Sequence, residues 1–281
     1  MSVSVSKLQQ QVEALLNAQT EAVDQKLELF SEVILGLDLG IVRVADRRPD
    51  GDWQVHSWVK QVILWGFKYG RLIEIPGYAG SFYDKDTLEL KKLSLHDQVR
   101  MVPGGSVARK GSYLAPGVIV MPPSYINIGA YVDRDTMIDS HVLVGSGAQV
   151  GCRVHLSAGV QIGGVLEPIG SLPVIVEDDA FIGGSCGIYE GVIVGERAVL
   201  ASGVVLNHSV QIFDQVHDCF ITAQAGAPLM IPPGAVLVPG SRPLKTKHAL
   251  AHQIQVSCPV IVKYRDARTD NALTLEESLH I

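Results

Sequence analysis

The chain has 281 residues, 47% of them hydrophobic and only 6% aromatic, with a formal net charge of −6. Negative charge argues against a nucleic-acid-binding protein, which needs a basic surface. The sequence shows no membrane span and no signal peptide, and its four cysteines form no CxxC pair, so we expect a cytoplasmic protein.

Residues 1–99 carry no regular repeat and predict a separate α+β domain. Apolar residues at three- and four-residue steps across 6–39 predict amphipathic helix in two segments. The apolar runs 41–45 and 53–56 predict the two strands of a hairpin, and 58–67 predicts a further helix.

Through the middle of the chain, an aliphatic residue returns every six residues. These residues are Leu114, Val120, Ile126, Val132, Ile138, Val144, Val150, Leu156 and Ile162, then Val176, Ile182, Ile188, Val194, Leu200, Leu206 and Ile212. A helix has a period of 3.6 and an ordinary strand a period of 2, so neither explains a strict six. The pattern predicts a mainly β protein built as a hexapeptide parallel β-helix, with three short strands per triangular coil and the six-residue series inside.

The six-residue series is interrupted between Ile162 and Val176, where about eight residues, near 167–173, should loop out of the stack. Segment 217–233 also lacks the repeat, and 235–238 is expected to form a last coil. We therefore expect the β-helix domain to occupy residues 100–240.

Residues 241–281 form a tail with an expected strand at 260–262 and a short helix at 273–279. Cations gather there, whereas few occur in the preceding coils; they are Arg242, Lys245, Lys247, Lys263, Arg265 and Arg268. Because Lys and Arg neutralise phosphate oxygens, this end could bind a phosphorylated ligand. The alternative is a solvated tail.

Two stretches go beyond a generic repeat. Segment 121–168 (MPPSYINIGAYVDRDTMIDSHVLVGSGAQVGCRVHLSAGVQIGGVLEP) resembles the signature region of tetrahydrodipicolinate N-succinyltransferases, and 181–196 (FIGGSCGIYEGVIVGE) resembles that family's next block. The Gly-Asp-Trp hairpin and the FYDK segment near the N-terminus match in kind.

This resemblance implies a homotrimer of left-handed β-helices with active sites at subunit interfaces. It also implies transfer of a succinyl group from succinyl-CoA, a co-substrate rather than a permanently bound cofactor, to the amine of an acyclic amino-oxo-dicarboxylate. That reaction belongs to the diaminopimelate and lysine pathway and needs no metal.

The resemblance also assigns candidate site residues. Asp139 and Glu190 match active-site carboxylates, with Asp139 able to orient the acceptor's amine and accept its proton. Arg100 matches an arginine that holds a substrate carboxylate, and Ser146 is a further candidate for substrate binding. Without the resemblance, Asp139 would be interpreted as a turn residue, and Glu190 and Arg100 as solvated surface charges.

Coenzyme A is expected toward the end of the prism. Ser202 and Gly203 offer backbone amides late in the coils, where pantetheine runs along a coil edge in this superfamily. Lys245 and Lys247 are candidates for its phosphates.

Counting coils predicts where the two carboxylates lie. Asp139 and Glu190 are 51 residues apart, and removing a loop of about eight residues leaves about two coils plus one hexad. They should therefore lie on adjacent faces of one prism, about 10 Å apart along its axis. Such residues could converge between neighbouring subunits.

The chain also departs from the family pattern. His141 stands where the family usually has Trp, Gly147 where it has Cys, and 185–187 lacks the usual Arg and Glu. A different amine acceptor, an acetyl donor, or a secondary-metabolite pathway are therefore alternatives.

Two other functions are alternatives for this sequence. One is a zinc site built from His141, His155 and His208, which would require the three imidazoles to converge. The other is a non-catalytic β-helix scaffold.

Overall fold

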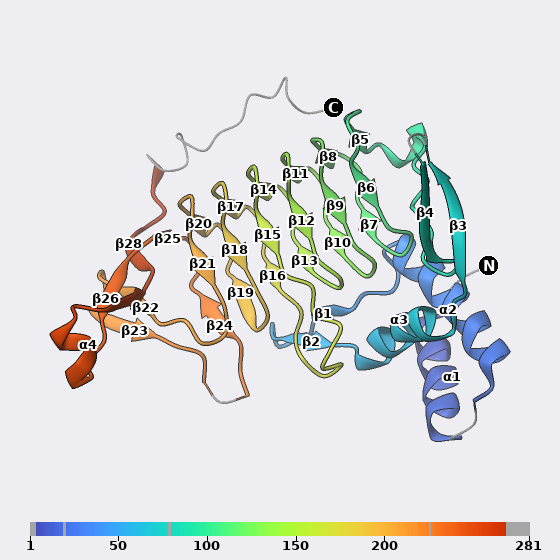
Figure 1. The fold of residues 1–281 in the computed structure, drawn as a ribbon, viewed down its shortest axis with the longest axis horizontal. Helices are drawn as coiled ribbons and strands as arrows, with labels where there is room; N and C mark the ends of the chain where they lie inside the picture. The colour runs from blue at the N-terminus through green and yellow to red at the C-terminus, as the bar shows by residue number, and fades with distance from the viewer. Residues whose placement is uncertain (1–3, 19–20, 78–79, 225, 268–281) are drawn as a thin grey trace.

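The computed structural model describes residues 4–18, 21–77, 80–224 and 226–267. A prism of stacked short strands runs along its length, with the N-terminal helices at one end and an arm of strands and a short helix at the other (Figure 1). Within these ranges, no helix is long and apolar enough to cross a membrane.

The N-terminal region is α+β, as the sequence predicts. Its elements are α1 (Val5–Asn17), α2 (Val23–Asp38), β1 (Ala45–Arg47), β2 (Trp53–Val55), α3 (Ser57–Tyr69), β3 (Leu72–Gly77), β4 (Gly80–Lys85) and the 3₁₀ helix η1 (Leu95–Asp97). The three predicted helices are confirmed. The predicted hairpin has its first strand at Ala45–Arg47 rather than 41–45, because Val42 and Val44 instead pack into the core of the helices.

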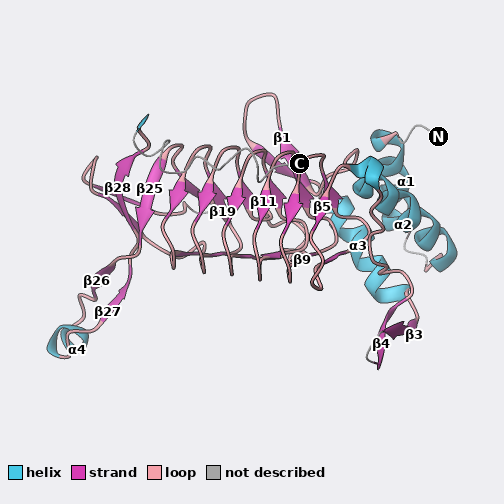
Figure 2. Cartoon of the chain, turned by 90° about the horizontal axis from the view of Figure 1, so that it is seen from above, coloured by secondary structure: helices cyan, strands magenta, loops and turns pink. Residues whose placement is uncertain are grey.

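The prism has three faces. Face 1 contains β5 (Arg100–Met101), β8 (Ile119–Val120), β11 (Met137–Ile138), β14 (His155–Leu156), β17 (Phe181–Ile182), β20 (Val199–Leu200), β25 (Ala235–Val238), β28 (Val260–Tyr264), β22 (Ile212–Asp214) and β23 (Cys219–Ile221). Face 2 contains β6 (Val107–Ala108), β9 (Tyr125–Ile126), β12 (Leu143–Val144), β15 (Gln161–Ile162), β18 (Gly187–Ile188) and β21 (Val205–Leu206). Face 3 contains β7 (Tyr113–Leu114), β10 (Tyr131–Val132), β13 (Gln149–Val150), β16 (Ile175–Val176), β19 (Val192–Val194) and β24 (Leu229–Ile231). The coils pair in parallel, which confirms the predicted β-helix (Figure 2).

The six-residue series forms the core of the prism. Each of its residues is at most 4% exposed, and together they belong to one continuous apolar cluster. A strand of two residues turns one side chain inward and the next outward. Only one inward aliphatic residue is needed per strand, and this explains why the hexad repeat is so strict.

Left-handed residues make the corners. Between faces 1 and 2, the turn residues His141, Gly159, Ser185 and Gly203 have φ between 59° and 79°. Their amides donate to the preceding coil, in order to Pro123 O (2.7 Å), Ser140 O (2.8 Å), Ala158 O (2.9 Å) and Gly184 O (3.0 Å). The corner is thus a regular column of backbone hydrogen bonds from which side chains project.

The last residue of the series behaves differently. Ile212 is buried, but its strand β22 does not continue face 3; β24 takes that place beside β19. Instead β22 pairs with β23 and β28 and widens face 1. Ile212 is therefore inside, as the series predicts, although its strand pairs with the distant β28 instead of continuing face 3.

The first interruption leaves the phase of the coils unchanged. β13, before the excursion, pairs directly with β16, after it. The excursion lies near the N-terminal region: Leu166 packs against the helical core, which also contains Ile128 of the prism. A cation–π contact also joins the N-terminal region to the prism: the Arg43 guanidinium lies over the Tyr131 ring of β10, 3.7 Å from the ring centroid.

A buried lysine joins α3 to this excursion. Lys60 is fully buried, and its ammonium donates to the Ser171 carbonyl at 2.5 Å. Burial lowers its pKa from 10.5 to about 8. Between those values the unfolded chain holds a proton that the folded protein has released, so the lysine's contribution to the free energy of unfolding rises with pH.

We therefore expect Lys60→Met to remove this pH dependence. The free energy of unfolding of the wild type relative to the variant should rise between about pH 8 and 10.5, by at most about 3 kcal/mol. Urea unfolding at several pH values measures it. Lys68→Met, an exposed position on the same helix, is the matched control, and an equal slope in both variants would contradict the assignment.

Beyond the prism, an arm projects that the sequence does not predict (Figure 2). It consists of β26 (Ser241–Pro243), α4 (Lys247–Ala251) and β27 (Gln255–Ser257). The strand expected at 260–262 is confirmed as β28, which is longer by two residues, Lys263 and Tyr264. The helix expected at 273–279 lies outside the described residues.

Candidate active site

Asp139 lies at the corner between faces 1 and 2. It directly follows β11, and its N–H donates to Leu156 O at 2.9 Å, which keeps the backbone in register with the next coil. Its Oδ1 accepts the amide N–H of Ser140 at 2.7 Å. The carboxylate is therefore fixed in the turn by one oxygen while the side chain stays partly exposed. The turn role and a functional role are compatible.

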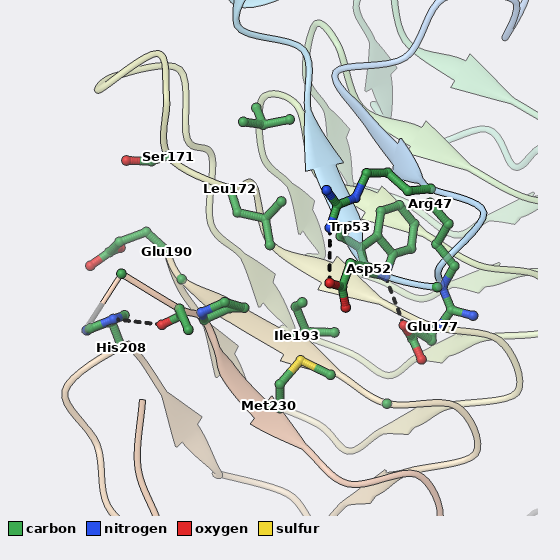
Figure 3. Close-up of a pocket in the computed structure, with 18 of the residues that line it drawn as sticks. Arg47, Asp52, Trp53, Ser171, Leu172, Glu177, Glu190, Ile193, His208 and Met230 are labelled. Carbon is green, nitrogen blue, oxygen red and sulfur yellow. Dashed lines mark hydrogen bonds and ion pairs between the residues drawn. The ribbon is translucent and has the colours of Figure 1, made fainter. Parts of the chain in front are cut away.

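Glu190 lies at the next corner, between faces 2 and 3. It follows β18, is exposed, and lines a cavity of about 960 Å³. Ser171 and His208 flank it, while Arg47 and Trp53 of the N-terminal hairpin form the opposite wall (Figure 3). The cavity thus combines residues from three distant parts of the chain.

Glu177 forms a fixed part of this cavity wall. It is 8% exposed, accepts from Trp53 Nε1 at 2.9 Å and from the Glu196 amide at 3.2 Å, and pairs with Arg47. With its oxygens so engaged, Glu177 anchors the hairpin rather than offering a free base. The sequence gives no local signal for this residue, since its partners are distant in the chain.

The coil count for the two carboxylates agrees with the strand register. Asp139 lies just before β12 in the chain, and Glu190 lies just after β18. Along face 2, β12 pairs with β15, and β15 pairs with β18. The two residues therefore lie at neighbouring corners and two coils apart, about 10 Å along the axis. Within one chain they belong to different corners.

Arg100 and Ser146 lie at different places on the prism. Arg100 is exposed in β5 on face 1, two strands before β11. Ser146 is 7% exposed at the corner between faces 2 and 3, and its carbonyl accepts from Val165 of the excursion at 3.1 Å. The structure thus places Ser146 beneath the excursion, in the same coil as Asp139.

The candidate coenzyme residues are divided between two places. Ser202 and Gly203 are exposed at the corner of Asp139, three coils farther along the prism. The Gly203 amide already donates to Gly184 O at 3.0 Å. Lys245 and Lys247 are exposed on the arm beyond the last coil, where Thr246 caps α4 by accepting from the Ala249 amide.

The three candidate zinc ligands, His141, His155 and His208, lie at different places on the prism. His141 lies at one corner, His155 in a strand of face 1, and His208 at another corner. Among the described residues, no group of three or more His, Cys, Asp or Glu side chains could hold a metal ion.

Stacked hexapeptide coils behind N-terminal helices place this chain in the class of hexapeptide-repeat β-helix proteins, which includes many acyltransferases.

Comparisons with known proteins narrow this class. A family model described as "Tetrahydrodipicolinate N-succinyltransferase N-terminal" matches residues 7–69, and one described as "Hexapeptide repeat of succinyl-transferase" matches 173–208. The chain is 46% identical to a 2,3,4,5-tetrahydropyridine-2,6-dicarboxylate N-succinyltransferase of Paraburkholderia xenovorans, over 90% of this chain and 88% of that one. Proteins with the same name from Acinetobacter baylyi and Bradyrhizobium diazoefficiens are 43% and 38% identical, each with 89% of its length covered. The chain belongs to the tetrahydrodipicolinate N-succinyltransferase family, which confirms the resemblance found in the sequence.

Proposed function

We propose that this protein transfers the succinyl group of succinyl-CoA to the amine of the acyclic form of 2,3,4,5-tetrahydropyridine-2,6-dicarboxylate, in the diaminopimelate and lysine pathway. The observation that carries the proposal is identity of 38–46% to relatives of that name, over 90% or more of this chain. The positions of Asp139 and Glu190 at exposed corners support it. All four cysteines are free thiols, in keeping with a cytoplasmic protein.

The chemistry follows from what amine acylation needs. The ammonium of the acceptor must lose a proton, its nitrogen must attack the thioester carbonyl, and the carbon–sulfur bond must break to release coenzyme A, whose thiolate takes up a proton. We assign to Asp139, whose Oδ1 accepts the Ser140 amide, the role of accepting the amine's proton. Arg100 supplies a guanidinium for one carboxylate of the acceptor.

The second carboxylate, Glu190, would reach the active site of a neighbouring subunit when subunits assemble into a trimer. Face 2 lies between the corner of Asp139 and the corner of Glu190. If face 2 turns toward the axis of a homotrimer, the Asp139 corner of each subunit meets the Glu190 corner of its neighbour. We propose this arrangement, in which each active site is shared by two subunits.

The test is release of free coenzyme A, followed with a thiol reagent. Succinyl-CoA should be consumed only when an amino-dicarboxylate such as 2-aminopimelate is present. A panel of other amines and acetyl-CoA separates this activity from the alternatives of a different acceptor or donor. If no amine supports release, the protein is a scaffold and the proposal fails.

The arm offers a separate prediction about the donor. Lys245→Ala and Lys247→Ala should each raise the KM for succinyl-CoA several-fold, because each removes a cation proposed to contact a coenzyme phosphate. The KM for the acceptor should stay within about twofold of the wild type. Lys110→Ala, an exposed lysine at the other end of the prism paired with Glu89, is the control. An effect on the acceptor's KM instead would place these lysines elsewhere.

A further inference from the structure

His208 lies beside Glu190 at the corner between faces 2 and 3. β18 pairs with β21, with Ile188 opposite Leu206. Two residues further on, Glu190 and His208 are therefore neighbours in successive coils, with their backbones about 4.8 Å apart. Figure 3 shows both on one wall of the cavity, opposite Trp53. The proposed chemistry uses Glu190 and leaves His208 without a role.

Backbone groups hold the His208 imidazole in one orientation. Its Nε2 lies 3.2 Å from the Ala227 carbonyl oxygen, and because a carbonyl only accepts, this nitrogen carries the hydrogen. The ring packs on Gly191, where an added Cβ would come within 3.0 Å of the imidazole Cδ2. The Leu229 amide, which donates to Gly191 O at 2.7 Å, fixes the loop that presents Ala227. In the neutral ring Nδ1 is therefore a hydrogen-bond acceptor, and it has no partner among the described residues.

The cavity suits a flexible, largely apolar chain that carries amide groups. Its walls include the apolar side chains of Trp53, Leu172, Ile193 and Met230. The two arginines of the hairpin are already paired with carboxylates of the protein. Ligand sites of this kind hold apolar groups and use a few polar groups to fix orientation. The lone pair of Nδ1 requires an N–H donor, and the pantetheine arm of coenzyme A offers methylene and methyl groups with two amides between them.

The position of His208 along the prism indicates which part of pantetheine it meets. β12, β15, β18 and β21 succeed one another along face 2, so His208 lies three coils beyond Asp139, about 14 Å along the axis. In the proposed trimer, the Asp139 corner of a neighbour meets the corner of His208. The acceptor's nitrogen, the thioester carbon and sulfur, and two methylene groups cover a comparable length when extended. The first amide of pantetheine then reaches His208, in the same coil as Ser202 and Gly203.

We propose that the cavity beside Glu190 binds the pantetheine arm of the acyl donor, and that His208 Nδ1 accepts a hydrogen bond from the amide N–H nearest the thioester. The inference rests on the proposed function, in which the donor is succinyl-CoA. His208 is a residue that binds the donor and takes no part in the proton transfers. It holds the thioester at a fixed depth, so that the carbonyl faces the acceptor's amine.

Two substitutions separate the accepting nitrogen from the ring. His208→Phe keeps a flat ring on Gly191 without a lone pair, and it should raise the KM for succinyl-CoA about tenfold, because the ligand's N–H loses its partner. His208→Asn places an amide oxygen where Nδ1 lies, so its KM should stay within about threefold of the wild type. The KM for 2-aminopimelate should change less than about twofold in both. His96→Phe, at an exposed histidine of η1, should change none of these constants.

Shortened donors locate the contact. Succinyl-N-acetylcysteamine keeps the first amide of pantetheine and no phosphate, so His208→Phe should still raise its KM about tenfold, whereas Lys245→Ala should leave it unchanged. The succinyl thioester of pentanethiol has a methylene in place of that N–H, and there the wild type and His208→Phe should agree within about twofold. Equal KM values of the wild type and His208→Phe for succinyl-CoA would overturn the proposal. An undiminished effect with the pentanethiol thioester, or an equal loss in His208→Asn, would overturn it as well.

Binding of free coenzyme A, measured by calorimetry, does not depend on transfer. The Kd of His208→Phe, with its folding verified by circular dichroism, should be about tenfold above that of the wild type. Such a difference in a protein that transfers no succinyl would uphold the coenzyme site and show that the proposed function is wrong. An equal Kd in an active enzyme would overturn the site alone, and a wild type that binds no coenzyme A would overturn both.

Discussion

Asp139→Asn and Glu190→Gln should each lower the kcat of succinyl transfer by at least about 100-fold, which is the usual contribution of a positioned acid or base. Both substitutions keep the size of the side chain and remove its charge. At Asp139 the amide oxygen of Asn can still accept from the Ser140 N–H, so the turn should form normally. Steady-state kinetics and thermal melting of the purified variants measure the two effects separately.

The control for charge removal is Asp135→Asn. Asp135 is also an exposed corner aspartate, but it has φ 59° and lies at the corner between faces 3 and 1. Asparagine tolerates that conformation. Wild-type kcat is expected there, and a loss equal to that of Asp139→Asn would mean that any corner charge matters.

Mixing the two variants tests whether each site is shared. In a trimer that contains both variants, one of the interfaces joins a wild-type Asp139 to a wild-type Glu190 of the neighbour. Random mixing in equal amounts should therefore restore about a quarter of the wild-type activity. If both residues served the same subunit's site, every site would carry one lesion, and mixed trimers verified by mass spectrometry would stay inactive.

The prism was predictable because its determinants are local. The choice of Val144 rather than Leu143 as the inward residue depends only on these two neighbours and the adjoining turn. The same local pattern recurs every six residues along the chain. Ile212 shows the limit of this reasoning. Its hydrophobicity correctly indicates burial, but its strand pairs with β28, which lies 47 residues later by the Phe213–Val260 register. No local pattern contains that information.

The candidate site also has a part that the sequence predicts and a part that depends on distant packing. Asp139 and Glu190 were located by resemblance, and their relative position by coil counting, which depends only on the phase of the repeat. The cavity beside Glu190 needs Trp53 and Ser171, which reach it by packing across the domain boundary and from the excursion. The arm that carries Lys245 was missed because its two short strands pair only with each other and contain Pro243, a poor strand residue.

The largest effect on stability is expected from a charge inside the prism. Val144→Asp should prevent the protein from folding or lower its melting temperature by more than about 15 °C. Val144 is fully buried in β12, between β9 and β15. An unpaired carboxylate there costs several kcal/mol, a large part of the 5–15 kcal/mol by which a typical domain is stable. Every coil rests on the one below, so the defect cannot be confined to one strand.

Val205→Asp is the matched control, because it makes the same change in a two-residue strand of the same face. Val205 is 45% exposed and occupies the outward position, while Leu206 beside it points inward. In the single subunit its carboxylate can remain hydrated, so the subunit should still fold, although a charge on face 2 should weaken the proposed trimer. Expression, circular dichroism and melting of both variants compare the two positions directly. If Val144→Asp folded as well as Val205→Asp, the inward and outward positions would be exchanged, which would overturn the register of the coils and the corner positions of Asp139 and Glu190 with it.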